Sequence, residues 1–137
     1  MAKPFRLISL LILILALLGG TIGCKSGSST TPEQDAILAY ADPATETTLK
    51  GLSENSLAKY TQYGNAEFKA AVTQKILDPV ASQINSQLGA YQSKEFLRTE
   101  EQQGYIIVHY KAKYAKGEVG VRMVFDTNHL VAGQFFE

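Results

Sequence analysis

The stretch Tyr105-Ile106-Ile107-Val108-His109-Tyr110-Lys111-Ala112-Lys113-Tyr114 decides the fold. Its side chains alternate between two faces. One face carries Ile106, Val108, Tyr110, Ala112 and Tyr114, and the other carries Tyr105, Ile107, His109, Lys111 and Lys113. This period of two is typical of a β-strand, because successive side chains point to opposite faces of a sheet. We therefore expect a strand over residues 105–114 with one face in the core.

Similar segments lie on both sides of this strand. After a turn at Lys116-Gly117, Val119, Val121, Met123 and Phe125 share a face and Gly120, Arg122 and Val124 lie opposite. A polar turn at 126–129 leads to a last strand at 130–136. Before the central strand, residues 93–102 have a mixed pattern and 100–104 form a polar turn. Three to four strands joined by short turns predict an antiparallel meander.

The residues before the sheet have a helical period. Thr31-Pro32-Glu33-Gln34 is typical of a capped helix start. An apolar stripe follows at three- and four-residue spacing, made of Ile37, Ala41, Ala44, Thr48 and Leu52. Asp42-Pro43 predicts a kink or a restart in it. A short helical turn is expected at 56–63. Residues 66–89 repeat apolar side chains every four residues, at Phe68, Val72, Ile76, Val80, Ile84 and Leu88, and this stripe is widened by Ala71, Leu77 and Ala81. Asp78-Pro79 predicts two helices there, or one kinked helix.

Helices followed by strands, each with one apolar face, predict an α+β fold. We expect the N-terminal helices to pack on one face of a curved, three- to four-stranded antiparallel meander sheet, as a single domain over 32–137. The chain has 137 residues, of which 45% are hydrophobic and 19% charged, so it is long enough for one core. Its 13 basic and 13 acidic residues balance, and this gives no reason to expect a nucleic-acid partner.

Residues 1–23 have the organisation of a secretory signal. Lys3 and Arg6 precede an apolar run at 7–18, which is shorter than the roughly 20 residues of a membrane-spanning helix. Thr21-Ile22-Gly23-Cys24 resembles the bacterial lipobox, in which the cysteine is acylated and becomes the new N-terminus. Cys24 is the only cysteine. We therefore predict lipid attachment at Cys24, the alternative being a chance cysteine after an ordinary signal.

The predicted anchor sets the expected location. Residues 24–31 comprise the lipidated cysteine and a polar, flexible tether that reaches only about 15 Å. The domain would then lie close to the extracytoplasmic side of a prokaryotic membrane in the cell envelope. The inner and the outer membrane both stay open.

The segment from about Leu49 to Phe136 resembles a family of small bacterial and archaeal proteins, the domain-of-unknown-function 3887 (DUF3887) family. The resemblance is carried by the order and spacing of short motifs: Lys50-Gly51-Leu52, Tyr60, Tyr63, Leu88-Gly89, 104–108, Lys113-Tyr114, 124–126 and 131–136. The family is similar to the cone-shaped nuclear transport factor 2-like and cystatin-like α+β folds. The resemblance implies a fold and a compartment but no catalytic residues.

The sequence contains no familiar catalytic or cofactor motif. Gly-x-Ser-x-Gly, Gly-x-Gly-x-x-Gly and the phosphate-binding P-loop pattern are missing. Neither His109 nor His129 has a second ligand two or four residues away. We therefore expect no metal and no cofactor.

These observations favour a membrane-anchored, non-catalytic binding or interaction module. One alternative is a cone-fold protein that binds a small apolar ligand in an aromatic-lined pocket of Tyr110, Tyr114, Phe125 and Phe135, unless these side chains only pack in the core. Another is an acid–base enzyme that uses His109, Asp126, Tyr110 and Tyr114, although the alternation puts His109 and Tyr110 on opposite faces. A homodimer through Ile107 and Val124 on the outer face is also compatible.

Overall fold

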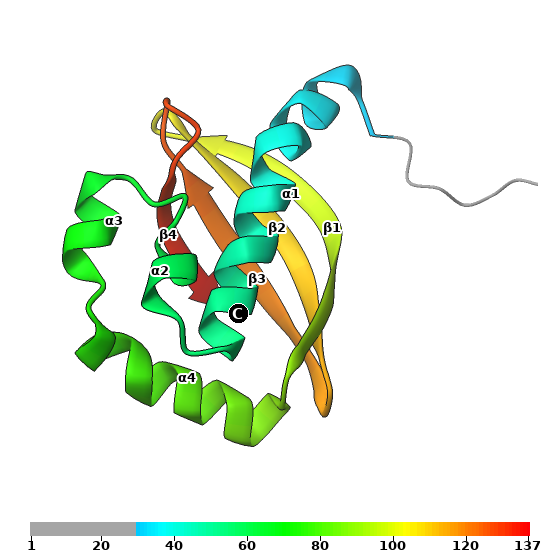
Figure 1. The fold of residues 1–137 in the computed structure, drawn as a ribbon. Helices are drawn as coiled ribbons and strands as arrows, with labels where there is room; N and C mark the ends of the chain where they lie inside the picture. The colour runs from blue at the N-terminus through cyan, green and yellow to red at the C-terminus, as the bar shows by residue number, and fades with distance from the viewer. Residues whose placement is uncertain (1–29) are drawn as a thin grey trace, which may run out of the picture.

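The computed structural model describes residues 30–137, in which a helical half precedes a sheet (Figure 1). The helices are α1 (Pro32–Ser53), α2 (Leu57–Tyr60), α3 (Ala66–Ala71) and α4 (Gln74–Leu88). The strands are β1 (Tyr91–Gln102), β2 (Tyr105–Tyr114), β3 (Gly117–Phe125) and β4 (Val131–Phe136). They form one antiparallel sheet in the order β1-β2-β3-β4. The predicted α+β meander is confirmed.

The predicted signal peptide, Cys24 and nearly all of the predicted tether lie outside the described residues. Within residues 30–137, no helix has both the length and the apolar character needed to cross a membrane.

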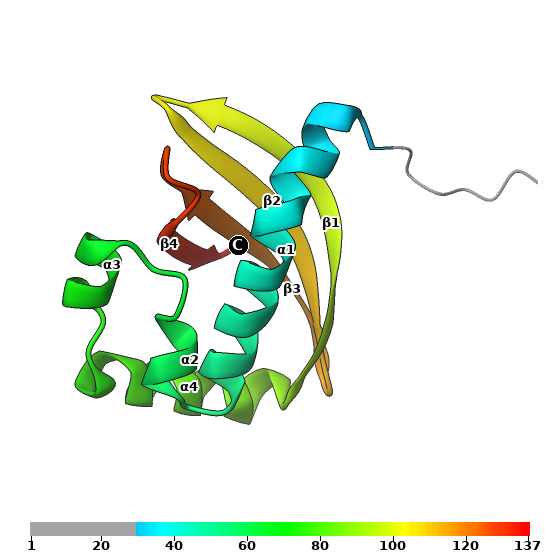
Figure 2. The ribbon, with the colours of Figure 1, turned by 45° about the horizontal axis from the view of Figure 1, so that its top comes forward.

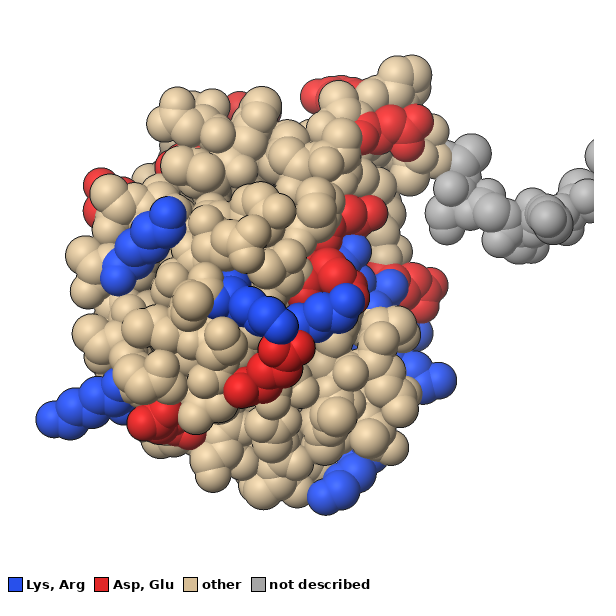
Figure 3. All heavy atoms as spheres, viewed as in Figure 1, with Lys and Arg blue, Asp and Glu red and all other residues tan. Residues whose placement is uncertain are grey.

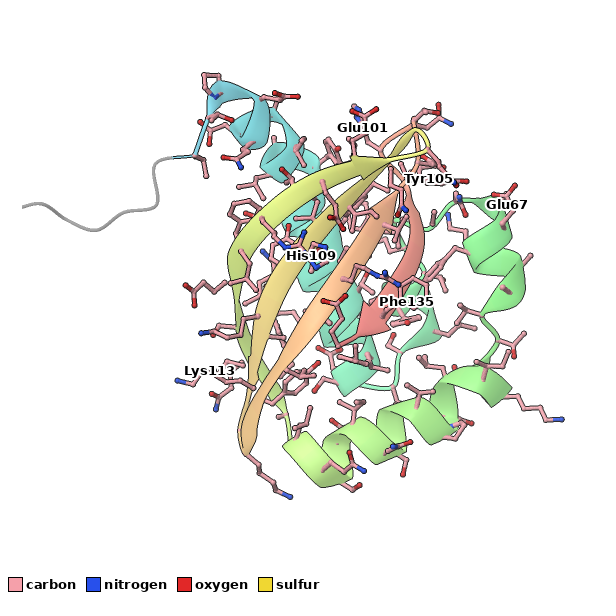
Figure 4. All side chains as sticks on the ribbon, turned by 180° about the vertical axis from the view of Figure 1, so that it is seen from behind. Glu67, Glu101, Tyr105, His109, Lys113 and Phe135 are labelled. Atoms are coloured by element: carbon pink, nitrogen blue, oxygen red, sulfur yellow. The ribbon has the colours of Figure 1, made fainter. Side chains whose placement is uncertain are left out.

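The sheet is curved, and its concave face holds the helices (Figures 1 and 2). α1 runs across this face, and α2, α3 and α4 complete the helical layer. The core lies between α1 and the sheet, where Leu49, Leu52, Tyr110, Met123 and Phe125 are fully buried. From behind, the strands lie in front of α1, and α3 and α4 are seen beside and below the sheet (Figure 4). Among the described residues, no helix covers this outer face.

α1 begins as predicted. The Thr31 hydroxyl accepts from the Gln34 backbone N–H, and the Gln34 side chain accepts from the Thr31 backbone N–H. The helix then continues through Pro43 without restarting at Asp42. Pro43 costs the helix one hydrogen bond. Pro43 lies on the exposed side of α1, so water can bind the carbonyl that loses its partner. Ala41 and Ala44 are buried, and their packing holds both halves of the helix on the sheet.

The prediction of two helices over residues 66–89 is confirmed, but the break between them lies elsewhere. The chain breaks at Val72-Thr73, between α3 and α4, and Pro79 lies inside α4. Within the predicted apolar stripe, Leu77 and Ala81 are buried, at 2% and 1% exposed, whereas Ile76 is 52% exposed. A helix turns 100° per residue, so a strict four-residue repeat drifts by about 40° at each step. The residues of the repeat in the N-terminal part of α4 therefore lie outside the stripe that faces the core.

The sheet is longer than the sequence pattern indicated. β1 extends to Gln102, so the predicted turn at 100–104 shrinks to Gln103 and Gly104. Both have positive φ, of 53° and 81°, as a two-residue type I′ hairpin requires. β1 also has register shifts between Tyr91 and Ser93 and between Phe96 and Arg98. These irregularities explain the mixed pattern of residues 93–102.

An irregularity in β4 decides where its aromatic residues point. Val131 pairs with Phe125, but Gly133 pairs with the next β3 residue, Val124, so β4 has one extra residue at this place. Beyond this bulge, Phe135 pairs with Arg122 on the outer face, and its neighbours on β4 point toward the core.

Candidate functional site

The outer face carries a histidine that is almost completely buried although no helix covers it. The His109 side chain, on β2, is 6% exposed. Its Nε2 lies 2.9 Å from Glu100 Oε1 on β1, and its Nδ1 lies 3.2 Å from Glu137 Oε2, just beyond β4. Figure 4 shows His109 in the middle of the strands. Each ring nitrogen of His109 therefore faces a carboxylate.

These groups belong to a row of alternating charges that crosses the sheet, which we call the His109 row. Arg98 Nη1 lies 2.9 Å from Glu100 Oε2 at one end. Arg122 Nε lies 3.9 Å from Glu137 Oε1 at the other end. Hydrogen bonds from His109 and then from Arg98 lower the pKa of Glu100 below its usual value. The row therefore keeps Glu100 ionised and paired.

A second row lies beside it. Lys111 Nζ, on β2, is 3.4 Å from Glu95 Oε2 on β1 and 3.8 Å from Glu118 Oε2 on β3. We call this the Lys111 row. All three side chains are well exposed, so these ion pairs add little to stability. Both rows have acids and bases in alternation across neighbouring strands.

Two glycines let large side chains lie flat on this face. A Cβ at Gly133 would come within 2.9 Å of the Phe135 ring, and a Cβ at Gly120 within 3.3 Å of Glu137 Cβ. The Phe135 ring in turn lies 4.6 Å from the Arg122 guanidinium carbon, which is cation–π distance. Phe135 nevertheless stays 48% exposed. Leu97, at the β1 bulge, and Tyr105, at the start of β2, are further exposed apolar residues.

The structure separates the four residues predicted to line a pocket. Tyr110, Tyr114 and Phe125 belong to the buried core on the concave face, and Phe135 lies on the outer face. Each core ring packs edge-on against another ring, with Tyr110 against Phe96, Tyr114 against Tyr91 and Phe125 against Tyr40. Two hollows lie elsewhere. One, of about 230 Å³, lies between the start of α1 and strands β1 and β2, and the other, of about 180 Å³, lies beside the β1–β2 turn. None of the four residues lines either one.

The four acid–base candidates do not converge either. His109 lies on the outer face, Tyr110 and Tyr114 lie on the concave face, and Asp126 accepts hydrogen bonds within the β3–β4 turn. Burial raises the pKa of Tyr110 far above its usual value and that of Tyr114 to about 12. Among the described residues, no three His, Cys, Asp or Glu side chains could together hold a metal ion.

Sequence reasoning missed two polar features. Lys94 points to the concave face, where its Nζ lies 2.7 Å from Asp42 Oδ1, and the Tyr110 hydroxyl donates to the same oxygen over 3.0 Å. If the positions of the β1 bulges had been known from the sequence, the alternation of this strand would have placed Lys94 on the concave face. The second feature is the Glu137 contact with His109, which joins residues 28 positions apart. Local periodicity holds no signal for such a pair.

The fold and the site define a small α+β domain whose helices cover one face of an antiparallel meander and whose other face carries the charged rows. The family model described as "Protein of unknown function (DUF3887)" matches residues 46–133, and the chain belongs to this family. No curated protein and no solved structure matches the chain. The likeness to nuclear transport factor 2-like and cystatin-like folds therefore stays a prediction.

Proposed function

We propose that this protein is an extracytoplasmic lipoprotein, anchored through Cys24, that acts as a non-catalytic interaction module and docks a protein partner through its outer face. The proposal for the anchor is supported by the signal-like residues 1–23, the lipobox-like Thr21-Ile22-Gly23-Cys24 and the short polar tether. One acyl chain gives only reversible membrane binding, so stable anchoring would need more than one chain on Cys24.

The observation that carries the docking proposal is the organised outer face. The concave face is occupied by helices, and its aromatic residues are packed in the core. The outer face instead presents the exposed ring of Phe135, stacked on Arg122 at the β4 end of the His109 row, and the Lys111 row lies beside that row. Exposed aromatic residues beside arginine are frequent anchors in protein interfaces.

The charge pattern favours a protein over a nucleic acid or a lipid surface as the partner. A nucleic acid or an anionic lipid surface presents one sign of charge and would meet as many acids as bases in these rows. A folded protein surface can place opposite charges against each residue in turn. The helical side offers a contrast, because the surface along α4 is largely uncharged (Figure 3).

Photo-crosslinking from single positions in cells tests the docking surface. A photoreactive residue in place of Phe135 should give a discrete crosslinked product, and one in place of Val80, an exposed apolar residue on α4, should not. The reversal Lys111→Glu should weaken the Phe135 product at least several-fold, whereas Lys75→Glu on α4 should leave it unchanged. Equal products from both positions, or none from Phe135, would contradict the proposal. A product of twice the mass of the chain would identify the partner as a second copy.

The anchor has its own test. Wild-type protein should incorporate labelled fatty acid and remain with the membrane fraction after a salt wash. Cys24→Ser should lose both properties while the domain keeps its fold. Fatty-acid labelling that persists in Cys24→Ser would exclude Cys24 as the attachment site.

A further inference from the structure

We infer that His109 is a proton-operated latch that holds the Glu137 side chain on the outer face, so that this face changes between a closed and an open state with pH. The inference concerns regulation of the surface proposed above for docking, and only its biological meaning rests on that proposed function. Its physical basis is the contact geometry of one ring.

Both ring nitrogens of His109 face carboxylate oxygens, at 2.9 Å and 3.2 Å. An ionised carboxylate can only accept hydrogen bonds, and a neutral imidazole carries a single N–H. Only the imidazolium can therefore donate to Glu100 and Glu137 at once. When the proton leaves, one nitrogen points its lone pair at a carboxylate oxygen that it cannot bind.

The surrounding charges decide which contact opens. The charged groups that face or neighbour His109 are Arg98 and Glu100 on β1, Lys111 on β2, Arg122 on β3 and Glu137 beyond β4. Glu100 has the shorter contact and a second partner in Arg98 at 2.9 Å. Glu137 has the longer contact, and its other partner, Arg122, is 3.9 Å away. The neutral ring should therefore keep its proton on Nε2 and release Glu137 from Nδ1.

Release of Glu137 changes the surface around Phe135. In the closed state Glu137 covers His109, and its Cβ lies close to the backbone at Gly120. In the open state the Arg122 guanidinium, which stacks on Phe135, is the remaining partner of the Glu137 carboxylate within this row. An increase in pH thus removes one of the two contacts that hold Glu137 in the row. The Glu137 carboxylate, then held only by Arg122, would be available to a partner.

Nuclear magnetic resonance on the full chain in detergent, without a partner, tests the latch. Nitrogen shifts of labelled histidine report which ring nitrogen carries a proton, and His129 in the exposed β3–β4 turn is the internal reference. At low pH both nitrogens of His109 should be protonated, and as the pH rises Nδ1 should lose its proton first. Over the same range the Glu137 amide, which donates to the Gly120 carbonyl over 2.9 Å, should lose several-fold in protection against hydrogen exchange. Loss of the proton from Nε2, or constant protection at Glu137, would overturn the latch.

Glu137→Gln provides the sharpest variant. The glutamine amide can accept from the imidazolium and can also donate to the lone pair of neutral Nδ1, so the contact should persist across the pH range. The pH-dependent loss of protection should then disappear. Glu118→Gln on the same face, in the Lys111 row, should retain it. Because these measurements contain no partner, failure of the latch leaves the crosslinking test intact, and failure of crosslinking leaves the latch intact.

Discussion

At the scale of single residues, the concave face contains buried hydroxyls with no hydrogen-bond partner among the described residues. Thr48 Oγ1, on α1, is one of them. A buried polar group without a partner costs about 1–3 kcal/mol, and valine has nearly the same shape as threonine. Thr48→Val should therefore raise the free energy of unfolding by about 1 kcal/mol in urea titrations. Thr47→Val, at the less buried neighbouring position, should have little effect. A destabilising Thr48→Val would mean that its hydroxyl has a partner.

A second single residue, Asp126, links stability to pH. Burial alone would raise its pKa, but hydrogen bonds from the Leu130 backbone, the Asn65 side chain and the Asn128 backbone outweigh burial and lower it below the ordinary 3.8. A lowered pKa in the folded state adds stability above the ordinary pKa, and this stability is lost as the pH falls through the folded value. Asp126→Asn should therefore be less stable than wild type at pH 7.

The difference between wild type and Asp126→Asn should shrink as the pH decreases from about 5 to about 2. Urea midpoints measured across that range check it, and the comparison removes the contributions of Glu100 and Asp78, whose pKa values are also lowered. A difference that stays constant with pH would show that the Asp126 carboxylate is not specifically stabilised by the turn.

At the scale of elements, α4 shows where a repeat misleads. The four-residue repeat predicts that Ile76 faces the core together with Leu77, and the structure buries only Leu77. Leu77→Ala should lower the free energy of unfolding by about 2–5 kcal/mol, because it leaves a cavity, whereas Ile76→Ala should cost less than about 1 kcal/mol. Thermal or urea unfolding of this neighbouring pair checks the rotation of α4. A larger loss for Ile76→Ala would place the other stripe inward.

The strands show which parts of the sheet can be predicted from local sequence pattern. β2 was predictable because ten residues alternate without a break, and this placed His109 and Tyr110 on opposite faces. β1 was not, because its two bulges mix the pattern. The prediction that Phe135 lines a pocket on the concave face failed for the same reason. One extra residue in β4 moves the side chains that follow it to the opposite face of the sheet. The partners of His109 come from two other segments, and only the register of the complete sheet brings them together.

At the scale of the whole molecule, stability and surface chemistry lie on opposite faces of one sheet. Phe125 and Phe135 illustrate this division. Phe125 is fully buried on the concave face, where its ring centroid lies 5.4 Å from that of Tyr40, and Phe135 is half exposed on the outer face. The helices and the concave face therefore hold most of the core, while exposed positions of the outer face such as Phe135 can change without unfolding the domain.

This division makes a direct prediction. Phe125→Ala should cost about 3–5 kcal/mol of unfolding free energy, a large part of the stability of a small domain, and Phe135→Ala should stay within about 1 kcal/mol of wild type. Urea unfolding followed by circular dichroism measures both variants. A large loss for Phe135→Ala would mean that the outer face is itself part of the hydrophobic core. The Phe135 side chain would then serve packing rather than contact with a partner. The predicted result leaves Phe135 free for docking, since a side chain that the fold does not need can change without loss of the domain.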